Sequence, residues 1–69
     1  MRNEILAVAR NQSGKTQLQV AKEVGIAEAA YRRYELGKCI PNAVLANTIA
    51  RTLGTTSEKL WGYKNPQSL

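Results

Sequence analysis

The chain contains no histidine and a single cysteine, Cys39. These scarcities exclude a histidine- or cysteine-rich metal site and a nucleophile activated by histidine. One cysteine forms no intrachain disulfide, although small secreted domains usually carry several. No apolar run approaches the roughly 20 residues that span a bilayer, and residues 1–10 lack the apolar stretch of a signal peptide. We therefore expect a cytoplasmic protein that holds no metal and no other cofactor.

Acidic residues are also few. Five Asp and Glu oppose ten Lys and Arg, and the formal net charge is +5 at pH 7. In a chain of 69 residues this charge favours an anionic partner: nucleic acid, a phosphate-rich membrane surface or an acidic protein. A merely soluble basic surface is the alternative. The carboxylates are scattered, with no convergent pair for acid–base chemistry, so we do not expect an enzyme.

Glycines divide the chain into segments that have helical periodicity and almost no strand alternation. Five short helices are expected, over residues 3–11, 16–24, 27–36, 42–53 and 57–61. In the first of them, Ile5, Leu6 and Ala9 form the expected apolar stripe. The sequence thus predicts an all-α domain over residues 1–62, followed by a C-terminal tail over residues 63–69.

Residues that cap helices stand at most of the expected N-termini. The expected caps are Asn3, Thr16, Asn42 and either Thr55 or Thr56. Thr16 and Gln19 have the spacing of a capping box, in which each side chain bonds to the backbone N–H of the other residue. Ala27, at the start of the third segment, has no side chain that can cap, and this costs about 1 kcal/mol.

Residues 17–36 combine two short helices around Gly25, which can adopt the left-handed conformation that ends a helix. Ala21 stands where two helices that cross at about 90–120° come close, and only a small side chain allows that approach. The expected inward residues are Val20, Val24, Ile26, Tyr31 and Tyr34. This pattern is typical of a helix-turn-helix, in which the second helix enters the major groove of DNA.

Several of these positions also belong to a family signature. The chain carries Thr16-Gln17, Ala21, Gly25, Glu35 with Gly37, Pro41, Ala50-Arg51 and Leu53-Gly54. On these residues the chain, over about residues 3–62, resembles the helix-turn-helix domains of the Cro and phage-repressor type, also called the xenobiotic-response-element type. The resemblance implies a repressor-like fold of five short helices, with the helix-turn-helix formed by the second and third.

The resemblance also implies which residues meet DNA. Base edges would be contacted by the start of the third helix and by residues one turn later, namely Glu28, Ala29, Arg32 and Arg33. Phosphates would be held by Gln17, Lys38 and Asn42. Lys15 lies near the same backbone track, with a solvated loop lysine as an equal alternative. Arg10 and Glu35 occupy the places of a structural ion pair that some members have.

Some positions leave two interpretations open. Glu28, where members often carry glutamine, either accepts a hydrogen bond from cytosine N4 or complements the dipole of the third helix. Arg33 is favoured for a guanine, and Arg32 for a base or a phosphate. Tyr31 packs its ring in the core, with a hydroxyl that reaches phosphate as the alternative. Cys39 is expected to be a small, half-buried filler rather than a redox sensor.

These observations favour a sequence-specific DNA-binding regulator, with repression as the default outcome. A single recognition helix has a small footprint, so we expect a homodimer on two half-sites about one helical turn apart. By resemblance, the dimer contact lies in residues 54–61, and pairing is weak or DNA-assisted. The alternative is a protein-binding module of the antitoxin or adaptor type, since the same fold serves both functions. The outward face of residues 27–36 is cationic rather than amphipathic, so we expect double-stranded DNA and not a membrane as the partner.

Overall fold

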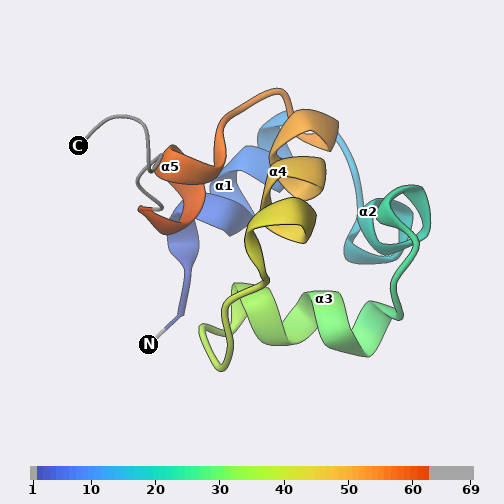
Figure 1. Ribbon diagram of the computed structural model, residues 1–69. Helices are drawn as coiled ribbons and strands as arrows, with labels where there is room; N and C mark the ends of the chain where they lie inside the picture. Colours follow the sequence, from blue (N-terminus) through green and yellow to red (C-terminus); the bar gives the residue numbers. More distant parts are fainter. Residues whose placement is uncertain (1, 63–69) are drawn as a thin grey trace.

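The computed structural model describes residues 2–62, and within this range it consists of five α-helices and no strand (Figure 1). The helices are α1 (Glu4–Gln12), α2 (Gln17–Val24), α3 (Glu28–Glu35), α4 (Ala43–Thr52) and α5 (Ser57–Trp61). The expected all-α fold is confirmed, and each helix begins and ends within one residue of the expected position. The expected tail over residues 63–69 lies outside the described residues. No helix in residues 2–62 has the length and apolar character needed to cross a membrane.

Side-chain caps begin every helix except α3. The capping box at α2 is complete, because the Gln19 N–H donates to Thr16 Oγ1 (3.1 Å) and the Thr16 N–H donates to Gln19 Oε1 (2.7 Å). The other caps are Asn3 for α1, Asn42 for α4 and Thr56 for α5. Ala27, before α3, makes no side-chain cap, as its residue type requires.

All five helices contribute to one hydrophobic core. Its buried residues are Leu6, Val20, Ala21, Tyr31, Ile49, Ala50, Leu53 and Leu60. The expectation for Tyr31 is met, because its ring is buried in this core. Trp61 packs against the core from its edge.

One expectation about burial is wrong, and one residue of an expected apolar stripe is exposed. Ile5, in the apolar stripe of α1, is 59% exposed. Leu6 and Arg10 lie one turn apart and face inward together, which turns Ile5 away from the core. Cys39 is exposed rather than half-buried, and Pro41 is the residue of this loop whose side chain is fully buried.

The turn between α2 and α3 sets the direction of α3. Gly25 has φ of 81°, in the left-handed region where a side chain would be strained. The N–H groups of Gly25 and Ile26 both donate to the Ala21 carbonyl at 2.9 Å, which closes the end of α2. Ala21 is fully buried at this corner. As a result α3 runs along the lower edge of the molecule in Figure 1, with α2 and α4 above it.

Candidate nucleic-acid interface

The helix α3 has an anchored face and an exposed face. Tyr31 and Glu35 are buried, and they hold α3 against the rest of the domain. The four residues that the sequence predicts to contact bases lie together on the other side of this helix. Ala29, Arg32 and Arg33 are exposed, and Glu28 is half-exposed. The structure therefore presents two guanidinium groups on the outer face of α3, where another molecule can reach them.

One of these arginines is paired and the other is not. Arg32 Nη2 lies 3.4 Å from Glu28 Oε2, one helical turn away, and both side chains remain substantially exposed. Arg33 has no ion pair with any residue of the part of the chain that the structure describes. The i, i+4 spacing of Glu28 and Arg32 is a sequence signal that could have predicted their pairing.

The predicted phosphate-contacting residues flank α3 at the start of α2 and in the α3–α4 loop. Gln17 is the first residue of α2, and its Nε2 donates to Glu35 Oε1 at 3.1 Å. This bond uses one N–H of the amide and leaves the second N–H and the backbone N–H for another acceptor. Lys15 Nζ lies 2.6 Å from Glu23 Oε1, in an exposed ion pair that was not expected from the sequence.

The other two residues predicted to contact phosphates make few contacts within the protein. Lys38 is exposed in the loop after α3. Asn42 is also exposed, and its Oδ1 accepts the Leu45 N–H at 2.9 Å to cap α4. The Asn42 amide nitrogen is therefore the part of this side chain that remains to donate to a phosphate.

A buried polar network joins α1, α2 and α3. Arg10 donates to both carboxylate oxygens of Glu35, at 2.5 Å from Nε and 3.4 Å from Nη2, which is the ion pair implied by the resemblance. Arg10 Nη1 also donates to the Lys15 carbonyl at 2.9 Å. With the bond from Gln17, these contacts fix the end of α3 relative to the start of α2. The two elements that carry the candidate DNA contacts therefore hold one mutual orientation.

The charges in this network are mutually stabilised. Burial raises the pKa of the Glu35 carboxyl, but the hydrogen bonds from Arg10 and Gln17 outweigh it and hold that pKa below its ordinary value. The same carboxylate raises the pKa of the Arg10 guanidinium. Burial, followed by the neighbouring Glu35, raises the pKa of the Tyr31 phenol. Glu35 is thus a carboxylate at neutral pH although it is only 2% exposed.

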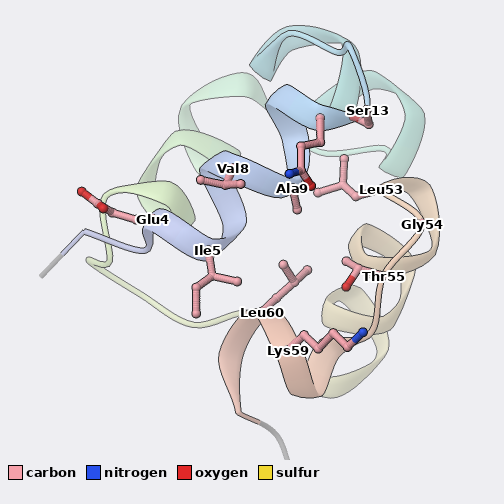
Figure 2. A pocket seen from close by; sticks show the side chains of 11 residues that line it. Glu4, Ile5, Val8, Ala9, Ser13, Leu53, Gly54, Thr55, Lys59 and Leu60 are labelled. Carbon is pink, nitrogen blue, oxygen red and sulfur yellow. The ribbon is translucent and has the colours of Figure 1, made fainter.

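A second surface feature lies away from α3. An open groove of about 540 Å³ lies between two parts of the domain, with α1 on one side and the α4–α5 turn and α5 on the other (Figure 2). Ile5 and Val8 of α1 line it together with Leu60 of α5, and no residue of α3 does. Ile5 is 59% and Val8 52% exposed, so the groove shows apolar surface to solvent. The sequence does not predict this feature, because the apolar stripe of residues 3–11 does not show that Ile5 stays exposed.

Comparison with known proteins identifies the class of this fold. Residues 6–60 match a family model described as helix-turn-helix. The chain therefore belongs to the helix-turn-helix family, in the Cro and phage-repressor type that its sequence resembles.

One similar protein is the cryptic phage CTXphi transcriptional repressor RstR of Vibrio cholerae serotype O1. The two are 37% identical over 59 residues, which is 86% of this chain and 53% of that protein. The chain thus spans about half the length of the curated relative it matches. No solved structure matches the chain.

Proposed function

We propose that this protein is a sequence-specific transcription regulator that binds double-stranded DNA with α3 in the major groove and represses by occupying an operator. The observation that carries the proposal is the division of α3 into an anchored face, with Tyr31 and Glu35 buried, and an outer face with Arg32 and Arg33 exposed. Membership of the helix-turn-helix family and similarity to a protein named as a transcriptional repressor support the same function. In this proposal residues 1–62 are the DNA-binding domain.

The contact residues divide into two groups. Those that contact bases are Glu28, Ala29, Arg32 and Arg33. Those that contact phosphates are Gln17, Lys15, Lys38 and Asn42. Lys15 is the most constrained cation of the second group, because it must release Glu23 before it binds a phosphate. Since that pair is exposed, the exchange costs little.

A homodimer completes the proposed function, because two copies on two half-sites provide the specificity that a single short helix lacks. We place the contact in residues 54–61, as the family resemblance implies. The groove supports this position, because Gly54, Thr55, Lys59 and Leu60 line it together with the exposed Ile5 and Val8. Apolar side chains that stay exposed in one copy are a favourable surface for a second.

Selection of bound duplexes from a random pool tests the proposal. We expect an enriched sequence made of two inverted half-sites, and binding that weakens steeply as salt rises, because phosphate contacts release counterions. A pool that shows no enrichment after repeated selection would refute sequence-specific binding and favour a protein-binding function. An enriched single half-site would retain DNA binding but contradict the dimer.

A further inference from the structure

We propose that Glu28 and Arg32 together recognise one C·G base pair, and that Glu28 increases the selectivity of Arg32 for that pair. This inference rests on the proposed binding of DNA by α3. Its basis is the ion pair on the exposed side of that helix, with Arg32 Nη2 at 3.4 Å from Glu28 Oε2. The Arg32 and Glu28 side chains are 52% and 39% exposed, so neither is committed to the core.

The pair presents a hydrogen-bond acceptor directly beside a donor fork. In the major groove a C·G pair offers two adjacent acceptors, guanine O6 and N7, and one donor, cytosine N4, next to O6. The Arg32 guanidinium bonds to O6 and N7, while the Glu28 carboxylate accepts from N4. Every polar group that this base pair exposes in the groove then has a partner of the opposite kind.

The same pair of side chains fits an A·T base pair poorly. There the two acceptors, adenine N7 and thymine O4, are separated by the N6 amino donor. A guanidinium fork that spans both acceptors points at the donor between them. The arrangement of Glu28 and Arg32 therefore distinguishes C·G from A·T by the order of donors and acceptors.

Glu28 also acts against DNA of the wrong sequence. Away from its base pair, Arg32 remains held by the carboxylate one turn away, and Glu28 adds a negative charge close to the phosphates. Both effects weaken binding to arbitrary duplexes. Arg33 has no ion pair among residues 2–62, so its contribution to binding does not depend on Glu28.

The test compares base preferences of the wild type with those of E28A, E28Q and R32A. Starting from a duplex selected by the wild type, each base pair of a half-site is replaced in turn and the dissociation constant is measured. For the wild type we expect a loss of about tenfold or more when one particular C·G pair is replaced. At that pair, R32A should discriminate by less than about threefold, and E28A should discriminate several-fold less than the wild type, while preferences at the other positions remain.

The matched control is E4Q, which makes the same charge change as E28Q at an exposed residue in the first turn of α1. We expect E28Q to bind a random duplex several-fold more tightly than E4Q does, and to show a weaker preference at the C·G pair than E4Q does. Circular dichroism verifies that all variants are folded. We expect them to fold because the substituted side chains are exposed.

The outcomes separate the two proposals. A wild type that selects a defined site, with E28A and E4Q both preserving its preference at every position, would overturn the joint recognition and leave sequence-specific binding intact. Loss of preference at several positions in E28A would also contradict the recognition of one base pair. A wild type that selects no site would overturn both proposals.

Discussion

Replacement of Arg10 by methionine removes the charge that faces the buried Glu35. The Glu35 carboxylate is 2% exposed, and Arg10 supplies contacts to both of its oxygens. Loss of one partner of a buried ion pair costs about 3–5 kcal/mol, because the other charge stays buried without compensation. A domain of 69 residues has a total stability of roughly 3–10 kcal/mol. Arg10→Met should therefore lose a large part of the free energy of unfolding.

Urea denaturation followed by circular dichroism at 222 nm measures this loss. Glu35→Gln provides the matched variant, since it removes the buried charge but keeps an oxygen that accepts from Arg10. The double variant Arg10→Met/Glu35→Gln should be less destabilised than the sum of the single variants, because no unpaired charge remains buried. A loss below about 1 kcal/mol for Arg10→Met, as at an exposed ion pair, would refute the reasoning.

Three further predictions concern Glu35, Arg33 and Val8. Because the folded pKa of Glu35 is lowered, its stabilisation is present above the ordinary glutamate pKa of about 4.3 and disappears as pH falls through the folded value. Urea titrations between pH 7 and pH 2 should show this decline in the wild type and a smaller one in Glu35→Gln. Arg33→Ala should relax preference at one base pair by about tenfold, and an equal loss on all duplexes in a binding titration would show a phosphate contact instead. Val8→Glu should abolish dimerisation in sedimentation while leaving the thermal midpoint nearly unchanged, since Val8 is 52% exposed; persistence of the dimer would remove the groove from the interface.

The parts of the fold that could be predicted from the sequence depend on local signals. Thr16 and Gln19 are three residues apart, and their capping box requires only the backbone between them. Gly25 ends α2 because its left-handed backbone conformation, with φ of 81°, does not continue the helix. Helix ends are determined by such nearby groups, and for this reason the expected ends and the observed ones agree.

The features that could not be predicted depend on contacts between residues far apart in the sequence. The bond from Gln17 to Glu35 joins residues 18 apart, and no spacing rule relates them. The apolar stripe of α1 includes Ile5 by its spacing, whereas the structure turns Leu6 inward together with Arg10, which pairs with Glu35 of α3. Sequence periodicity alone does not show which of two apolar faces a short helix buries.

The most direct measurement of DNA binding by α3 is an NMR titration of the ¹⁵N-labelled protein with a duplex selected from the random pool. If the outer face of α3 binds DNA, the largest amide shifts will lie at Ala29 and Arg33 and in the neighbouring loop. Shifts confined to the groove residues Ile5, Val8 and Leu60, with α3 unaffected, would contradict DNA recognition by this helix.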